Sequence, residues 1–146
     1  MKNYSKYFAV SDTDKSWGIY TLNCGTANIP PGDRYPPMDH PEGYLLNWNK
    51  GRILHEFQLI YLINGSGVFE SKTSGRIQLK AGSMVVVFPE VWHRYKPFPT
   101  ERWQTYWVGF AGKLADEFIH KLDLSRENPV KMIGYQQKTV QVYLDI

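Results

Sequence analysis

Short runs of apolar and β-branched residues, separated by glycine and proline, alternate along most of the chain. Runs of this kind at intervals of roughly ten residues predict strands joined by turns, as in a β-sandwich or barrel. The run 56–63 is apolar at odd and even positions alike, which predicts a strand buried on both faces. We expect strands at 17–29, 44–49, 56–63, 68–72, 76–80, 84–88, 93–98 and 103–110.

The connections between these runs also have a pattern. Four prolines within 30–37 predict an extended loop, because proline disrupts helices and central strands. Gly65 and Gly67 predict a tight hairpin turn at 64–67. Beyond residue 111 the apolar spacing becomes helical, which predicts two helices, at 113–122 and from residue 135 onward. The second helix has no C-cap before Ile146, so we expect it to be truncated and the chain to be the front part of a longer protein.

Composition narrows the class of protein. The chain has 146 residues, enough for one domain with a substantial core, and 15% of them are aromatic while 21% are charged. The net charge of +3 is small, and the basic residues are scattered, so direct nucleic-acid binding is not expected. A polar N-terminus, one cysteine (Cys24) and the lack of a long apolar run argue against a secreted disulfide scaffold or a membrane protein. We therefore expect a cytoplasmic protein.

One spacing resembles a metal-binding motif. Gly82, Phe88, Glu90 and His93 keep the spacing of the second cupin motif, which ends in a metal-binding histidine. Counting back from Gly65, the first cupin motif would place its ligands at positions 52, 54 and 58. Arg52 and Leu54 cannot bind a metal there, and Gln58 is a weak neutral ligand. Because a catalytic transition metal needs three or four nitrogen or carboxylate donors, we expect a cupin barrel without a metal or other cofactor.

The remaining histidines and the cysteine suggest no catalytic site. His40 is expected in a loop, His55 just before a buried strand, and His120 on a solvated helix face. Cys24 is expected to be an inert buried thiol. No Ser/His/Asp or Cys/His arrangement stands out, so we do not expect an enzyme.

Aromatic residues on two adjacent late strands predict a binding pocket. Strand alternation places His93 and Tyr95 on one face, and Trp103, Thr105 and Trp107 on one face. If both faces point inward, they form a pocket in which rings can stack on the apolar face of a sugar while polar groups bond its hydroxyls. The alternative is that the two tryptophans only fill the core.

Several segments together resemble the ligand-binding domain of AraC-type (arabinose regulator) transcription factors. They are 51–61, 65–71, 81–89, 92–95 and 106–110, with the proline-rich stretch 30–41. The resemblance implies a mainly β, cupin-like double-stranded β-helix (a jelly-roll barrel) with two C-terminal α-helices. It divides the chain into an N-terminal arm (1–16), a ligand-binding barrel (17–111) and a helical part leading to a dimerisation region (112–146). A DNA-binding domain with two helix-turn-helix motifs would follow Ile146.

The same resemblance implies a ligand site. In the arabinose regulator the sugar lies inside the barrel and the arm folds over it, and its ligand contacts match Tyr95, Thr105 and Trp107 here. The family's buried ligand-binding arginine best matches Arg52. Thr105 stands where the arabinose regulator has a histidine, which predicts that a different hydroxyl pattern is read.

We therefore predict a sugar-sensing, homodimerising domain that reaches DNA only through the domain after Ile146. The predicted ligand-binding residues are Arg52, Gln58, His93, Tyr95, Trp103, Thr105 and Trp107. The alternatives are a small metal-dependent cupin enzyme (an isomerase or dioxygenase), an extracellular carbohydrate-binding module, and a barrel with a vestigial pocket that only dimerises.

Overall fold

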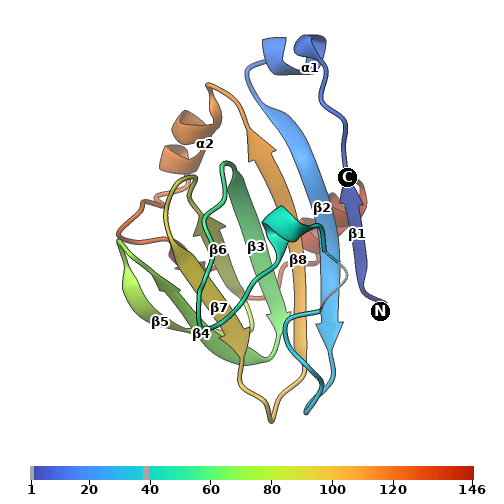
Figure 1. The fold of residues 1–146 in the computed structure, drawn as a ribbon, viewed down its shortest axis with the longest axis vertical. Coiled ribbons are helices and arrows are strands. Elements are labelled where there is room, and N and C mark those ends of the chain that lie inside the picture. Colours follow the sequence, from blue (N-terminus) through green and yellow to red (C-terminus); the bar gives the residue numbers. More distant parts are fainter. Residues whose placement is uncertain (1, 38–39) are drawn as a thin grey trace.

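Two antiparallel sheets face each other in the computed structural model, which describes residues 2–37 and 40–146 (Figure 1). In this described part of the chain the larger sheet has six strands and the smaller has three. The larger sheet runs in the order β1 (Tyr4–Tyr7), β2 (Tyr20–Ile29), β8 (Trp103–Ala111), β3 (Phe57–Asn64), β6 (Ser83–Val87) and β9 (Val130–Met132). The smaller sheet runs in the order β5 (Gly75–Lys80), β4 (Ser66–Ser71) and β7 (His93–Pro97).

Strand β3 is buried on both faces, as its apolar run predicts. Ile60 and Leu62 point between the sheets and pack in a core with Trp103. Phe57 points the other way, into a second core that includes Ile119 of helix α2 (Ala115–Lys121). The strand therefore lies at the centre of the molecule, with the space between the sheets on one side and helices on the other.

The two predicted C-terminal helices are present, and a third lies in the N-terminal arm. Helix α1 (Asp12–Ser16) begins with a capping box, in which Ser11 Oγ accepts a hydrogen bond from the Asp14 backbone N–H and Asp14 accepts one from the Ser11 N–H. A short 3₁₀ helix, η1, spans Glu42–Tyr44. No helix in the described ranges is long and apolar enough to cross a membrane.

Helix α3 (Gln137–Leu144) is held on the outer face of the larger sheet by tyrosines. The Tyr143 ring stacks near Tyr61 and Tyr106, and its hydroxyl donates to the backbone oxygen of Leu59 at 3.1 Å. Figure 1 shows this segment passing behind the sheet. The C-terminal helical part is thus packed against the strands that form the larger sheet's centre.

Three predictions about the strands need correction. The glycines at 64–67 do not close a hairpin, because β3 and β4 belong to different sheets and Gly65 carries the chain from one to the other. Residues 44–49 do not form a strand: Tyr44 ends η1, and the residues after it make one isolated bridge, from Asn47 to Gly51. Strands β7 and β8 also lie in opposite sheets rather than side by side in one.

The N-terminal arm is docked as an edge strand. β1 pairs antiparallel with β2, with Tyr4 opposite Thr26 and Tyr7 opposite Asn23. Gly25 makes this close approach possible, because a Cβ atom there would lie 2.3 Å from both the Tyr4 carbonyl oxygen and the Trp107 ring. The arm therefore lies directly against the strand pair that forms one wall of the barrel.

Candidate ligand-binding site

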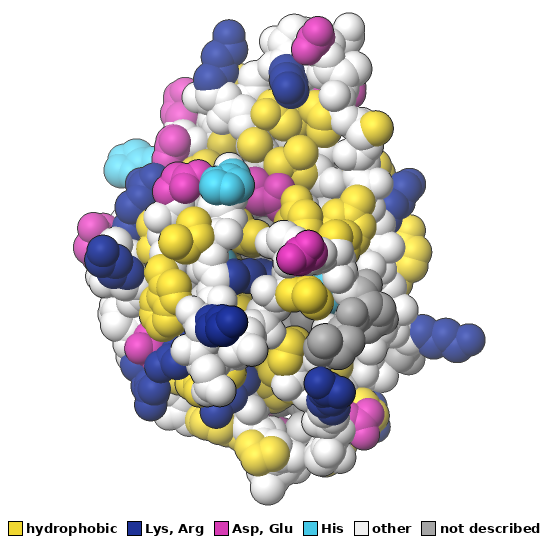
Figure 2. Space-filling view, viewed as in Figure 1, with side chains coloured by type: hydrophobic (Ala, Val, Ile, Leu, Met, Phe, Trp, Pro, Cys, Tyr) yellow, Lys and Arg dark blue, Asp and Glu magenta, His cyan; other side chains and the backbone are white. Residues whose placement is uncertain are grey.

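A cavity lies between the two sheets and is covered by the arm and the proline-rich loop. Its volume is about 50 Å³. It is lined by Tyr7, Ala27, Tyr35, Pro36, Pro37, His40, Tyr44, Leu46, Arg52, Gln58, Ile60, Tyr95, Trp103, Thr105 and Trp107. Figure 2 shows a shadowed hollow near the centre of the face viewed, with basic side-chain atoms inside it.

Six of the seven predicted site residues line this cavity. They are Arg52, Gln58, Tyr95, Trp103, Thr105 and Trp107. The alternation that places Trp103, Thr105 and Trp107 on one face of β8 holds, and that face points inward. Trp103 is also part of the core, at 1% exposure, so it fills the interior and lines the cavity at once.

His93 is the predicted site residue that does not line the cavity. It is 1% exposed and lies behind Arg52, with its ring stacked near Phe69 and Tyr95. Burial, and then the positive charge of Arg52, lower the pKa of His93 to about 3. A neutral imidazole there can accept a hydrogen bond from Arg52 and position it.

Arg52 is the polar centre of the cavity. Its Nε donates to His93 Nε2 at 3.0 Å, and its Nη1 donates to the Tyr44 carbonyl oxygen at 2.7 Å. Its Nη2 donates to Gln58 Oε1 at 3.1 Å and to the Tyr95 hydroxyl oxygen at 3.2 Å. The guanidinium is therefore fixed by groups from β3, β7 and η1.

The side chains at the cupin ligand positions do not fit a transition metal. His93 Nε2, the nitrogen that would bind it, is already occupied by the Arg52 N–H. Across residues 2–37 and 40–146, no group of three or more His, Cys, Asp or Glu side chains is arranged to hold a metal. Arg52 thus places a permanent cation beside the histidine that a metal would need.

The arm and the loop contribute residues that the strand pattern did not predict. Tyr7 of β1, Tyr35 and His40 of the loop, and Tyr44 of η1 all line the cavity. The Tyr7 hydroxyl is 3.0 Å from His40 Nδ1, and the Tyr7 and Tyr44 ring centroids are 5.0 Å apart. The His40 ring in turn lies edge-on to Trp107 at 5.8 Å. Sequence periodicity carries no signal for such contacts, because they join segments that lie far apart in the chain, and only β1 among these segments is a strand.

A buried carboxylate adjoins the cavity without lining it. Glu56 is 6% exposed, and its two oxygens accept hydrogen bonds from Asn23 Nδ2 at 2.6 Å and the Tyr44 hydroxyl at 2.9 Å. Burial and the charge of Glu56 raise the pKa of Tyr44 to about 12. Tyr44 therefore stays protonated and connects Glu56 to Arg52, whose Nη1 donates to the Tyr44 backbone oxygen.

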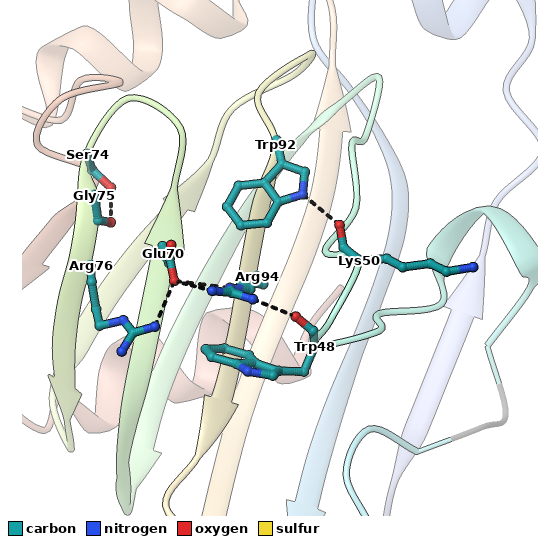
Figure 3. Close-up of polar contacts among 8 residues, drawn as sticks. All are labelled: Trp48, Lys50, Glu70, Ser74, Gly75, Arg76, Trp92 and Arg94. Carbon is teal, nitrogen blue, oxygen red and sulfur yellow. Dashed lines mark hydrogen bonds and ion pairs between the residues drawn. The ribbon is translucent and has the colours of Figure 1, made fainter.

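A cation–π cluster on the outer face of the smaller sheet anchors the segment that carries Arg52. Figure 3 shows the Arg94 guanidinium between the rings of Trp48 and Trp92, at 4.3 and 5.3 Å from their centroids. Arg94 also donates to the Trp48 carbonyl oxygen, while the Trp92 indole N–H donates to that of Lys50. Glu70 accepts two hydrogen bonds from Arg94, which hold the pKa of that carboxyl below its usual value.

Cys24 and His55 lie outside the cavity, in surroundings that suggest no chemical role. Cys24 is buried in β2, and burial raises the pKa of its thiol, as expected for an inert cysteine. His55 is exposed and pairs with Glu90, which raises the pKa of His55. Neither side chain lines the cavity.

Comparison with known families matches residues 47–144 to the AraC-like ligand-binding domain. This match covers most of the barrel and both C-terminal helices. The chain belongs to this AraC-like family. The resemblance to AraC-type ligand-binding domains is therefore confirmed. The predicted fold, a mainly β, cupin-like double-stranded β-helix, is confirmed as well. Membership of the AraC-like family implies that the domain binds a small-molecule effector and serves a ligand-sensing regulator.

Solved structures with low sequence identity resemble the fold of this AraC-like domain. The YhaK protein of Escherichia coli is 12% identical, with a TM-score of 0.52 over 76% of this chain and 45% of the YhaK chain. A Cupin 2 conserved barrel domain protein from Salinispora arenicola is 18% identical, with a TM-score of 0.44 over 82% of this chain and 84% of its own. No protein with a curated description matches the sequence significantly.

Proposed function

We propose that this domain senses a small polyhydroxylated molecule, such as a sugar, which binds in the cavity between the sheets. The observation that carries the proposal is that Tyr7 of the N-terminal arm forms part of the cavity wall together with Tyr95 and Trp107 of the two sheets. A ligand in the cavity therefore contacts the barrel and the arm at once. Binding and the position of the arm are then linked.

The size of the cavity supports this linkage. At about 50 Å³ it has room for a few water molecules, whereas ligand pockets span about 300–1,000 Å³. A sugar can enter only if part of the wall moves outward. The barrel strands are held by longer ladders, while the arm is held by the four-residue edge strand β1 and a few flanking hydrogen bonds. These run from the Phe8 N–H to the Leu22 oxygen, from the Thr26 hydroxyl to the Lys2 oxygen and from the Asn28 N–H to Asn3 Oδ1. The arm and the adjoining loop are thus the parts of the wall that move at least cost.

The chemistry of the wall suits a sugar. Trp107 and Tyr95 offer ring faces for the apolar C–H surface of a pyranose or furanose. Thr105, Gln58 and the tyrosine hydroxyls offer hydrogen bonds to its hydroxyl groups. The wall combines rings and neutral polar groups with one arginine, Arg52, and among the described residues it carries no acidic side chain. This mixture favours a binding site over a catalytic centre, and we propose that the domain is not an enzyme.

We further propose that ligand binding changes dimerisation of this domain, and through it the activity of a DNA-binding domain in the same regulator. We place this regulator in the cytoplasm. Helix α3 presents Val142 and Leu144 to solvent, each 58% exposed, which supports a role for this end of the domain in pairing with a second copy. A reduced, buried Cys24 is compatible with the cytoplasm.

A panel of sugars tests the proposal directly. A ligand at a hundredfold excess over its Kd stabilises the fold by about 2.7 kcal/mol, which raises Tm by several degrees. We expect such a rise with one class of sugar, accompanied by a change in tryptophan fluorescence that Trp107→Phe reduces. No shift in Tm with any sugar at millimolar concentration would contradict the proposal. Stoichiometric iron, manganese or zinc in the purified protein, measured by elemental analysis, would instead favour an enzyme.

A further inference from the structure

The charge of the cavity wall restricts which polyhydroxylated molecule fits. Among the lining residues that belong to the described ranges, Arg52 is the one Lys or Arg side chain, and none is Asp or Glu. Within the described ranges 2–37 and 40–146, no ion pair joins Arg52 to a carboxylate. A half-buried guanidinium thus faces the cavity with neutral partners only, an arrangement that favours an anion entering beside it.

The hydrogen bonds of Arg52 also leave the wall rich in donors. Gln58 turns its carbonyl oxygen to Arg52, so its NH₂ group remains for a ligand. The Tyr95 oxygen accepts from Arg52, so its hydroxyl proton is free to point elsewhere. Nη1 donates one of its two protons to Tyr44 and keeps the other. The acceptor atoms near Arg52 are therefore occupied, and three donor groups remain: the Gln58 NH₂, the Tyr95 hydroxyl and the second N–H of Arg52 Nη1. Three donors suit an oxyanion better than a neutral hydroxyl.

We propose that the effector is a sugar acid or a related hydroxy acid, with its carboxylate bound beside Arg52, Gln58 and Tyr95. This inference rests on the proposed function, because it concerns the ligand of the same cavity. A carboxylate carries one negative charge and matches the single guanidinium. A phosphate monoester carries about −1.5 to −2 at neutral pH and would leave charge uncompensated in the cavity.

Glu56 sets the strength of this preference. Tyr44 connects the two charged groups, because its hydroxyl donates to Glu56 and its carbonyl oxygen accepts from Arg52. Both carboxylate oxygens of Glu56 already accept a hydrogen bond. Its negative charge weakens the attraction of the cavity for an anion without offering an acceptor on the wall. Replacing Glu56 with Gln keeps the shape of the side chain and removes that charge, so binding of a carboxylate should become tighter.

Matched ligand pairs test the inference by isothermal titration calorimetry on the purified domain. The pairs are glucuronate with glucose and galacturonate with galactose, and gluconate and glucose 6-phosphate are added to the panel. We expect at least one sugar acid to bind tenfold or more tightly than its neutral partner, with the difference shrinking as salt increases. Arg52→Gln should abolish the difference, while Arg76→Gln, which removes an exposed arginine outside the cavity, should preserve it.

The outcomes separate the two proposals. If a neutral sugar binds as tightly as its acid, or if the phosphate binds best, the carboxylate inference is overturned and the sensing function stands. If neither the acids nor a wider sugar panel binds, both are contradicted. If Arg52→Gln fails to fold, Glu56→Gln decides: a tighter Kd for the sugar acid with an unchanged Kd for a neutral sugar supports the inference, and no change in the acid's Kd counts against it.

Discussion

Arg52 and His93 form the polar centre between the two sheets, and their contact determines the charge of the histidine. His93 is buried and accepts a hydrogen bond from a cation, so its protonated form is strongly disfavoured in the folded protein. An unfolded histidine takes up a proton near pH 6.5. The two states therefore bind different numbers of protons between about pH 6.5 and pH 3.

Stability should fall as the pH is lowered through this window. Because the pKa of His93 is lowered to about 3, the unfolded state binds the extra proton below pH 6.5, and acid favours unfolding. We expect a loss of about 1.4 kcal/mol in the free energy of unfolding per pH unit from this residue. Urea denaturation at pH 7.5, 6 and 5 measures it.

Two variants identify the residue responsible. His93→Gln, which does not titrate, should flatten the pH dependence even if it lowers stability at pH 7.5. His55→Gln serves as the control, since His55 is exposed and its pKa shift has the opposite sign. An unchanged pH slope in His93→Gln would show that other groups cause the acid sensitivity.

Substitutions at two glycines with positive φ distinguish the cost of backbone strain from the cost of close packing. Gly65 has φ +97° and a Cβ there would lie 2.0 Å from the Arg102 carbonyl oxygen, whereas Gly75 has φ +70° and open space around it. We expect Gly75→Ala to cost about 1 kcal/mol through strain, and Gly65→Ala to cost at least twice as much. Equal losses in urea denaturation would contradict the packing constraint at Gly65.

At the scale of single residues, the sequence predicted the face of each strand better than the depth of each side chain. Alternation is local, so it correctly placed Trp103, Thr105 and Trp107 on one inward face. The position of His93 depends on Arg52, which lies 41 residues away in the chain and covers it. Contacts at that separation leave no trace in the periodicity of either segment.

Among the elements, β3 was predictable because its apolar run is continuous, and the hairpin at 64–67 was not. Glycine at Gly65 indicates a positive φ, but it does not specify which strand pairs with which. The chain uses that turn to pass between sheets, where Gly65 allows the backbone of Arg102 to approach. Residues 44–49 do not form a strand, because the carbonyl oxygens of Tyr44 and Trp48 accept from the side chains of Arg52 and Arg94 rather than from a neighbouring strand.

The Arg94 cluster is an element-scale device that should affect the cavity from outside. Arg94→Met keeps an apolar stem between the tryptophans but removes the hydrogen bonds to Glu70 and to the Trp48 carbonyl. We expect a loss of roughly 1–2 kcal/mol in the free energy of unfolding and weaker ligand binding, because the segment carrying Arg52 loosens. Arg76→Met is the matched control: it removes only an exposed contact to Glu70 and should change both quantities little. Equal effects of the two substitutions would contradict the anchoring role.

For the molecule as a whole, the arm is predicted to report on the cavity. Tyr7→Ala removes its phenol from the wall and its contact to His40, so we expect ligand affinity to fall about tenfold or more. Tyr4→Ala is the control, because Tyr4 is 56% exposed on the same strand and does not line the cavity. Calorimetry gives the affinities. Hydrogen exchange of residues 4–7 with and without ligand tests whether the arm changes state, and identical exchange rates would contradict the linkage.

The overall fold was predictable because glycine and proline mark the ends of successive apolar runs, and the family resemblance supplied the topology. The covering of the cavity by the arm and the proline-rich loop was predictable only in part. The prolines fixed the loop as extended, but Tyr7, Tyr35 and His40 reach the cavity through packing between segments that no single pattern connects. The wall that distinguishes this domain from an open barrel is thus the part least visible in its sequence.

The pairing of β1 with β2 also governs what the rim of the larger sheet offers to other molecules. While β1 is docked, the outward N–H and C=O groups of β2 are satisfied by a strand that is short and carries Lys6, features that discourage further chains from adding on. When the arm departs, those groups become a vacant template for an incoming strand. A stimulus that frees the arm would then allow the domain to exchange this strand with a second copy of itself.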